Sequence, residues 1–315
     1  MDFCVGAVAA MASTLVTNPL DVIKTRAQLQ GELTARGYYV PFYNDSLQSM
    51  RMIIQKEGFL ALQKGLLTSV IHQGVRNGVK LGLYEWLSFK GFLCDDVNTI
   101  NFYNSLMASA FGGGMGALLT TPLYRLSTQF QARAAPEIAV GYQHRHSGLV
   151  QALMSTYRTS GVQVLWKGTN ANLVRSVVGA AAQLTTFSHV KEVLRDYEVF
   201  RYSRVLTAFV AGTFGGMCQT IFQTPFDLVC IRLNNQYVYK NGRGALYHGM
   251  LHCFYKIIRY EGLFALYKGL PIIYVKNSRH TTLYLIVWEL LKAYQHDVLL
   301  IEDRPHSCYH DPDDI

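Results

Sequence analysis

The chain has 315 residues, of which 50% are apolar and only 16% are charged. Soluble domains carry about 25% charged residues, so this composition excludes a disordered chain and argues against an ordinary soluble enzyme. The net charge of +8 combines a basic body with an acidic end, because residues 297–315 contain six acids and a single arginine. A membrane protein whose helices are apolar on one side only accounts for this balance.

Two short motifs each occur three times along the chain. The stretches "TNPLDVIKTR", "TTPLYRLSTQ" and "QTPFDLVCIR" place their prolines at residues 19, 122 and 225, at intervals of 103 residues. The stretches "EGFLALQKG", "SGVQVLWKG" and "EGLFALYKG" begin 38, 38 and 36 residues after those prolines. The spacing predicts a tandem triplicate. Its repeats are expected at 1–97, 98–199 and 200–296, followed by an acidic, disordered tail at 297–315.

The sequence pattern of each repeat predicts the same secondary-structure elements in the same order. An apolar helix rich in small residues runs into the proline and past it, and a polar loop follows. A short amphipathic helix comes next, near 46–56, 149–159 and 250–260. The Lys-Gly pair then opens a second long helix, which is expected to end near Lys90, Leu194 and Tyr294. The prediction is an all-α membrane protein with six tilted spanning helices in pseudo-threefold arrangement, plus three short helices in the long loops.

Glycines four residues apart occur in the first helix of repeats two and three, at Gly112 and Gly116 and at Gly212 and Gly216. This spacing places both members of a pair on one helix face, where the missing side chains let another helix approach. Both pairs therefore predict close contacts between neighbouring helices.

The charges of the loops predict the orientation of the bundle. The three long loops within the repeats hold thirteen Lys and Arg against five acids, whereas the two short loops between repeats hold five of each. Loops rich in Lys and Arg stay on the side from which the protein inserts. The long loops are therefore expected on that side of the membrane, and both termini on the other.

An ionisable residue stands eight positions after the lysine of each Lys-Gly pair, at His72, Arg175 and Lys276. At about 1.5 Å per residue the three lie at equal depth, roughly 12 Å into their helices. Ionisable side chains at one membrane level are costly unless they face a water-filled cavity, so this symmetry predicts a ring of substrate-binding residues. The polar neighbours that extend the ring are Gln73, Arg76, Asn77, Ser176 and His280.

The repeated pattern Pro-x-[Asp/Glu]-x-x-[Lys/Arg]-x-[Lys/Arg], followed by [Asp/Glu]-Gly and [Lys/Arg]-Gly, resembles the signature of the mitochondrial carrier family (solute carrier family 25) over about residues 1–296. The stretches "TPLY", "EIAVGYQHRHSG", "VRSVVGAAAQLTTFS" and "PFDLVCIRLNNQ" resemble the branch with members 34 and 35 and the fungal oxaloacetate carrier. The resemblance implies an exchanger of the mitochondrial inner membrane, with the long loops in the matrix and the termini toward the intermembrane space. The three ring residues match the family's substrate contact points.

The resemblance also implies a gate on each side of the ring. The residues implied for the matrix gate are Asp21, Lys24, Gln28, Gln131 and Asp227. Those implied for the cytoplasmic-side gate are Glu85, Lys191, Glu289 and Lys292. The matrix gate keeps a single family ion pair, Asp227–Lys24, because repeat two lacks the acid and the base. The opposite gate keeps two pairs, Lys191–Glu289 and Lys292–Glu85.

The side chains of the ring favour a small anion as the substrate. The guanidinium of Arg175 can hold two oxygens at once, and Ser176 can hold a third or a keto oxygen. Lys276 adds a second cation for a substrate with two charges. Nucleotide carriers of the family have glycine and an aliphatic residue at the second contact point, so nucleotides are not expected. His72 either titrates and lets a proton accompany the anion, or serves as a neutral hydrogen-bond donor.

Other functions find little support in the sequence. We expect no enzyme, no cofactor and no metal site, because no catalytic set or metal-ligand spacing is present. Nucleic-acid binding is not expected, since the basic residues are divided among the loops. The expected partners are small anionic metabolites and membrane lipids, above all cardiolipin, at the N-termini of the short helices and of those opening at Gly65, Gly168 and Gly269. A monomer is expected.

Two functional hypotheses remain open at this point. The first is alternating-access exchange of small dicarboxylates, oxaloacetate-like keto acids, malonate or sulfate. The second is a degenerate carrier fold that acts as a structural or adaptor protein, or as a proton leak. It rests on repeat two, where Tyr124, Ser127 and Ser160 replace charged residues of the motifs.

Overall fold

The computed structural model describes residues 2–35, 38–43, 45–92, 102–146, 148–195, 204–239 and 242–298. Its six long helices are α1 (Asp2–Leu29), α3 (Leu66–Phe89), α4 (Phe102–Ala132), α6 (Thr169–Arg195), α8 (Arg204–Asn235) and α10 (Leu270–Val298). The short α-helices are α2 (Ser46–Glu57), α5 (Leu149–Ser160) and α9 (Met250–Glu261). The 3-10 turns are η1 (Phe59–Gln63), η2 (Pro136–Ile138), η3 (Val162–Trp166) and η4 (Leu263–Tyr267). The described residues form no strand, only an isolated bridge between Val238 and Gly244.

The predicted elements are therefore present, with ends within a few residues of the expected ones. The last long helix differs most, because it runs to Val298 instead of ending near Tyr294. The first two residues of the predicted acidic tail thus belong to α10. The remainder of that tail, 299–315, lies outside the described residues.

The six long helices form a closed ring, in which each helix packs against two neighbours. The order around the ring is α1, α3, α4, α6, α8, α10 and back to α1. The first helix of each repeat, α1, α4 or α8, also contacts the other two. These three helices contain Pro19, Pro122 and Pro225 in their interiors, where a proline removes a backbone hydrogen bond and bends the helix.

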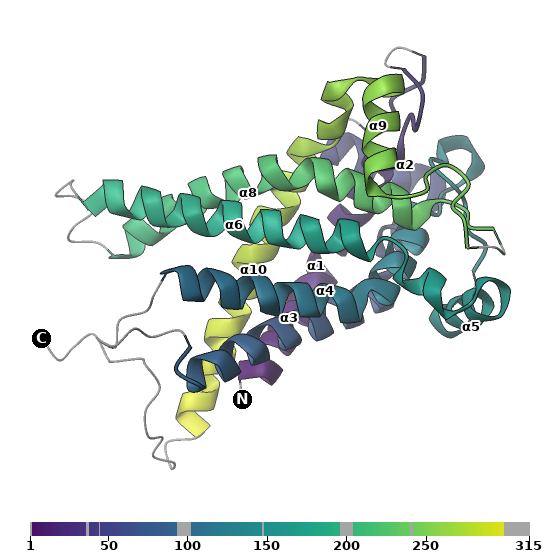
Figure 1. The fold of residues 1–315 in the computed structure, drawn as a ribbon. Coiled ribbons are helices and arrows are strands. Elements are labelled where there is room, and N and C mark those ends of the chain that lie inside the picture. The colour runs from purple at the N-terminus through teal and green to yellow at the C-terminus, as the bar shows by residue number, and fades with distance from the viewer. Residues whose placement is uncertain are drawn as a thin grey trace, which may run out of the picture.

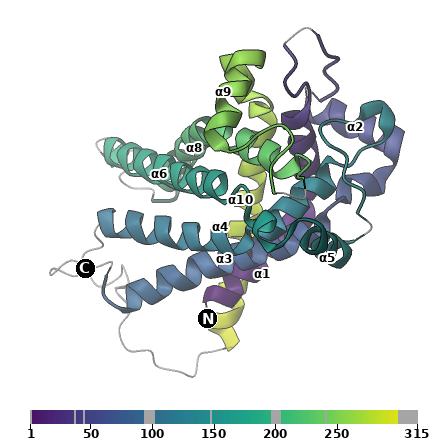
Figure 2. The same cartoon turned by 45° about the vertical axis from the view of Figure 1, so that its right-hand side comes forward.

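The contacts between α1, α4 and α8 lie after the prolines, close to the short helices. Figures 1 and 2 show α2, α5 and α9 together at this end of the molecule, which we call the short-helix end, while the long helices spread apart toward the N-terminus. The ring is therefore closed at the short-helix end by side chains of α1, α4 and α8.

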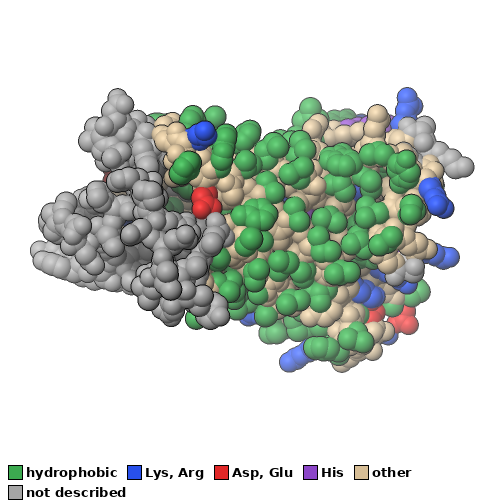
Figure 3. All heavy atoms as spheres, turned by 90° about the horizontal axis from the view of Figure 1, so that it is seen from below, with side chains coloured by type: hydrophobic (Ala, Val, Ile, Leu, Met, Phe, Trp, Pro, Cys, Tyr) green, Lys and Arg blue, Asp and Glu red, His purple; other side chains and the backbone are tan. Residues whose placement is uncertain are grey.

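The outer surface of the ring is apolar. The face seen in Figure 3 is covered mainly by hydrophobic side chains, and most of its charged side chains gather toward the side of the short helices. Val16, Phe111 and Phe222 are examples of large apolar side chains that point outward. Each long helix has 24 to 32 residues, more than the roughly 20 needed to cross a bilayer. Phe3–Leu29 and Tyr103–Ala132 are also apolar enough over their length to be candidate spans on composition alone.

The prediction of close approach at glycines is correct for repeat two and wrong for repeat three. A Cβ on Gly112 would lie 2.9 Å from the Lys80 carbonyl oxygen, and one on Gly116 would lie 2.9 Å from that of Arg76. Helices α3 and α4 therefore touch backbone to backbone. Gly212 and Gly216 face open space, and Gly215 makes the close approach instead, 3.1 Å from the Gln183 carbonyl oxygen. The four-residue spacing fixes a shared face but not which face the neighbouring helix occupies.

The two glycines of each second motif end one helix and begin another. Gly58, Gly161 and Gly262 follow the short helices with φ of 86°, 81° and 87°. The glycines of the Lys-Gly pairs precede the second long helices with φ of 74°, 96° and 77°. Residues with a Cβ are strained at such angles, which explains why glycine stands at these places. The turn that they enclose brings each lysine back toward the end of its short helix.

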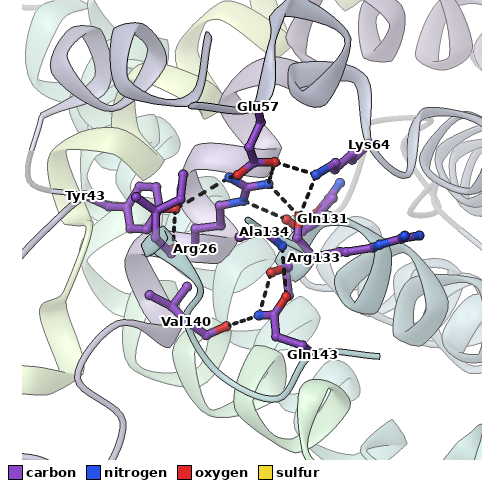
Figure 4. Close-up of polar contacts among 11 residues, drawn as sticks. Arg26, Tyr43, Glu57, Lys64, Gln131, Arg133, Ala134, Val140 and Gln143 are labelled. Atoms are coloured by element: carbon purple, nitrogen blue, oxygen red, sulfur yellow. Dashed lines mark hydrogen bonds and ion pairs between the residues drawn. The ribbon is translucent and has the colours of Figure 1, made fainter. Parts of the chain in front are cut away.

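A buried ionic triad fixes the short helix in repeats one and three. Arg26 is fully buried, and its guanidinium donates to both Glu57 carboxylate oxygens, at 2.6 and 3.0 Å. Lys64 pairs with the same carboxylate, as Figure 4 shows. Glu261 is held in the same way by Arg232 and Lys268. Repeat two has no counterpart of the triad, because Gln129 and Ser160 take the positions of the arginine and the acid.

Candidate functional site

The predicted ring residues lie at one level inside the bundle. His72, Arg175 and Lys276 each stand six residues after the first residue of α3, α6 and α10. Their exposed fractions are only 4%, 5% and 9%. Three ionisable side chains are thus enclosed at equal depth, one from the second long helix of each repeat.

Arg175 is bound from three directions. Its Nη1 lies 3.4 Å from the Asp227 Oδ1 on α8, and its Nη2 donates to the Asn172 Oδ1 at 2.9 Å. Its Cζ lies 5.2 Å from the centre of the Tyr124 ring on α4, a cation–π distance. The Nε has no hydrogen-bond partner. The guanidinium therefore keeps a donor for a ligand while its other nitrogens fix its position.

Lys276 and His280 join α10 to α1. The Nζ of Lys276 lies 3.1 Å from the Asp21 Oδ1, and the His280 Nε2 lies 3.3 Å from the Ser13 Oγ. The lysine thus has a carboxylate partner on the helix beside it, and the histidine has a neutral one.

A polar stripe follows one face of α3 at intervals of four residues. The His72 ring lies 5.1 Å from the Tyr124 ring, centroid to centroid, and its Nε2 has no hydrogen-bond partner. Arg76 donates from Nη2 to the Ser176 Oγ at 2.9 Å, which joins α3 to α6. Lys80, one turn further along α3, is exposed to solvent.

Gln73 and Asn77 contribute less to the site. The Asn77 side-chain amide donates to the Gln73 carbonyl oxygen of its own helix at 3.0 Å. Both side chains are half-buried. Both residues thus lie beside the stripe, and the Asn77 side chain uses one N–H for a hydrogen bond to the helix backbone.

The predicted gate pair of Asp227 and Lys24 is present at the short-helix end. The Lys24 Nζ lies 2.7 Å from the Asp227 Oδ2, and the Gln28 Nε2 donates to the same oxygen at 3.1 Å. Asp227 also binds Arg175 through its other oxygen. One carboxylate therefore joins the predicted gate to the predicted ring.

Repeat two closes the same end without charges. Gln131 accepts from the Thr25 Oγ1 at 2.9 Å and donates to the Ser69 Oγ at 3.0 Å. The Ser69 and Ser127 hydroxyls lie 2.6 Å apart. Ser127, which stands at the position of the missing base, thus takes part in a neutral hydrogen-bond network between α1, α3 and α4.

The opposite gate is only partly visible. Glu85 is half-buried on α3, and Lys191 is exposed on α6. The side chains of Glu289 and Lys292 lie outside the described residues, so neither predicted pair of this gate is placed.

Sequence reasoning treated the ring and the gate as separate layers, and it missed Tyr124, Asn172 and Ser13 as contacts of the ring. Asp21 was assigned to the gate, yet it pairs with the ring residue Lys276. A usable signal existed at Tyr124, because it stands where the motif of the other repeats has an acid. An aromatic side chain at that place can contact a cation without neutralising it.

The charge of the joined ring and gate is strongly positive. The described charged residues of this region are Lys24, Arg76, Lys80, Arg175, Lys276, Asp21 and Asp227. Five cations face two carboxylates, so three positive charges remain unmatched. A small anion with two charges fits this excess, whereas a cation would be repelled.

Comparisons with known proteins agree with the three-repeat organisation of the chain. The family model described as mitochondrial carrier protein matches residues 1–93, 98–198 and 202–298. A mouse protein named solute carrier family 25 member 35 is 39% identical over 294 residues, which are 93% of this chain and 98% of the mouse protein. The mitochondrial oxaloacetate transport protein of Saccharomyces cerevisiae is 31% identical, over 91% of this chain and 87% of its own length. These similarities confirm the resemblance drawn from the repeated motifs.

Proposed function

Because the chain belongs to the mitochondrial carrier family, a family of transporters of the mitochondrial inner membrane, we propose that it exchanges small anions by alternating access. The proposed substrates are oxaloacetate-like dicarboxylates or keto acids, malonate and sulfate. The observation that carries the proposal is the excess of cations around Arg175, with a serine hydroxyl and a second cation nearby. The similarity to an oxaloacetate transport protein supports the same class of substrate.

The joined ring and gate suggest how binding leads to opening. A substrate carboxylate that binds Arg175 and Lys276 takes the place of Asp227 and Asp21. Each cation then keeps a carboxylate partner, so breaking the two ion pairs within the protein costs little free energy. Asp227 then loses one of its two cationic partners, and the closed gate at the short-helix end loses the fixed position of that carboxylate. Binding energy is thereby used to open the gate.

The proposed orientation follows from the loop charges. We place the six long helices across the inner membrane, the short-helix end in the matrix and the termini toward the intermembrane space. The present structure then has its matrix side closed by Lys24, Asp227 and the hydroxyl network of repeat two. We further expect a monomer, with cardiolipin at the N-termini of the helices at the short-helix end.

The alternative function, a degenerate carrier without transport, rests on the altered motifs of repeat two. Hydrogen bonds among Ser69, Ser127 and Gln131 replace the missing ion pair. The substitutions at the gate therefore do not leave a gap in the closure. This favours transport over an adaptor role.

The substrate class is tested by uptake into liposomes that contain the purified protein. We expect labelled malonate, oxaloacetate or sulfate to enter, and ADP and ATP neither to exchange nor to compete. The physical reason is that Arg175 and Ser176 narrow the second contact point and add a charge there. Efficient exchange of ADP for ATP would contradict the assignment. A lack of uptake of every small anion tested would support the adaptor alternative.

A further inference from the structure

Repeat two differs from its neighbours at a second place, away from the ring. The residues three positions after the prolines are Val22, Arg125 and Leu228. Val22 and Leu228 are fully buried, and each belongs to an apolar cluster that includes the isoleucine of its short helix, Ile53 or Ile257. In repeat two, Arg125 takes the place of the aliphatic residue on the long helix. Thr156 takes the place of the isoleucine on the short helix. Both changes introduce polar groups at one apolar contact.

Arg125 is buried without a counter-charge. Only 2% of the residue is exposed, and neither its Nε nor its Nη1 has a hydrogen-bond partner. No carboxylate of the described chain forms an ion pair with it. Arg26 and Arg232, equally buried, are each paired with a glutamate. A buried guanidinium left unpaired in this way is strongly destabilising unless an anion compensates for it.

A second cation lies near Arg125. Lys167 corresponds to Lys64 and Lys268, but its Nζ donates to the Gly242 carbonyl oxygen at 2.6 Å, since repeat two lacks the glutamate. Burial and then the charge of Arg125 lower the pKa of Lys167. Both cations therefore belong to one electrostatic environment, from which the acid of the other repeats is absent.

The neighbouring loop supplies no negative charge to this environment. Burial, followed by the charge of Arg125, lowers the pKa of His144 to about 4 although a hydrogen bond to the Asn235 backbone raises it. The His144 Nε2 donates to the Asn235 carbonyl oxygen at 2.8 Å, as a neutral imidazole can. Arg125 is therefore surrounded by neutral and cationic groups in the described chain.

We propose that the short-helix end of repeat two contains a second anion site, at Arg125 with Lys167 beside it, which binds a phosphate group. A guanidinium grips an oxyanion along either of two edges, and the unpaired Nε and Nη1 give each edge a donor. The phosphate comes from inorganic phosphate or from a phospholipid headgroup, since both present the same oxygens. The site lies apart from the substrate ring, because the equivalent residues Val22 and Leu228 pack in clusters with the short helices. The neighbouring Tyr124, by contrast, contacts Arg175 of the ring.

The test compares the protein with a variant that carries the apolar contact of the other repeats, Arg125→Leu with Thr156→Ile. Both are purified without added lipid, and their melting temperatures are measured against inorganic phosphate, with sodium chloride at equal ionic strength as the control. The measurements are repeated with phosphatidylglycerol or cardiolipin in mixed micelles. Ligands that bind only the folded state raise its melting temperature.

We expect a saturable rise in melting temperature for the natural sequence that the double variant lacks. A rise with phosphate identifies a free anion, and a rise with lipid alone identifies a headgroup. The same rise should persist in an Arg175→Ala background, which separates this site from the substrate ring. A rise equal in both proteins, or an absence of any rise beyond that in sodium chloride, would overturn the proposal.

If the double variant does not fold, Arg125→Lys serves in its place. Lysine keeps the charge but lacks the two edges of a guanidinium that can each hydrogen-bond an oxyanion, so binding of labelled phosphate or lipid should weaken. Binding unchanged by Arg125→Lys would likewise contradict the proposed site.

Discussion

Replacing Arg175 by alanine is expected to lower anion exchange at least about a hundredfold, which corresponds to about 2.7 kcal/mol of lost transition-state stabilisation. The guanidinium is the side chain that can hold two substrate oxygens, and it links the ring to the gate through Asp227. The protein should still fold, because Asp227 retains Lys24 and Gln28 as partners. Initial uptake rates of labelled malonate in liposomes measure the effect.

Two further variants show whether the effect arises from the geometry of the side chain. Arg175→Lys keeps the charge but cannot hold two oxygens in a fixed plane, so it should restore little activity. Arg158→Ala removes an exposed cation of α5 and should leave the uptake unchanged. Near-normal uptake by Arg175→Ala would show that the ring does not bind the substrate as described.

Replacing Glu261 by glutamine is expected to destabilise the fold by about 3–5 kcal/mol, because it removes the carboxylate that forms ion pairs with two buried cations. The carboxylate binds Arg232 and Lys268 and also accepts from the Leu33 backbone N–H at 2.8 Å. It therefore joins α8 and α9 to the turn after α1. For a chain of 315 residues the melting temperature should fall by roughly 5–8 °C.

A matched control is present on the surface. Lys56 and Glu137 form an ion pair whose side chains are 52% and 66% exposed. Glu137→Gln should therefore cost less than about 1 kcal/mol. Equal shifts of the melting temperature for the two variants would show that the buried triad does not fix the short helix.

The same carboxylate predicts the acid response of the fold. Burial alone would raise the pKa of Glu261, but hydrogen bonds and charges from Arg232 and Lys268 outweigh it and lower the pKa. The triad's contribution is therefore complete above the unfolded pKa of about 4.3 and is lost as the pH falls through the lower folded value. The melting temperature of Glu261→Gln should depend less on pH in this acidic range than that of the natural sequence.

The repeats and their helices could be predicted because two motifs recur at fixed spacing and contain the residues that bend, end or begin a helix. Glycines at positive φ end the short helices and open the long ones, so the boundaries followed from glycine positions. The ring could be predicted for a related reason. Equal counts from the Lys-Gly pairs give equal depth for His72, Arg175 and Lys276.

The union of ring and gate was not predicted, although a physical rule accounts for it. Side chains on a helix tilt toward its N-terminus. Arg175 and Lys276 stand on helices that begin at the short-helix end, so they reach toward that end. Asp227 and Asp21 stand on helices that finish there, so they reach away from it. The two sets meet, as Arg175–Asp227 and Lys276–Asp21.

Other features depend on facts that one helix cannot supply. The close approach at Gly215, in place of Gly212 and Gly216, depends on which face α6 occupies. The isolation of Arg125 depends on the absence of acids from α5 and from the loop around His144, which only the folded chain brings together. Counting along the sequence gives depth and face but not the identity of the neighbour.

The central claim, exchange by alternating access, is tested most directly by counter-exchange. Uptake of labelled malonate into liposomes is compared with and without unlabelled malonate inside. An exchanger changes from its inward-open to its outward-open state faster when it carries a substrate back. Internal malonate should therefore speed uptake several-fold, and liposomes without internal malonate should show little net proton flux. An uptake rate that is the same with and without internal malonate, or a proton leak without anion exchange, would contradict the account.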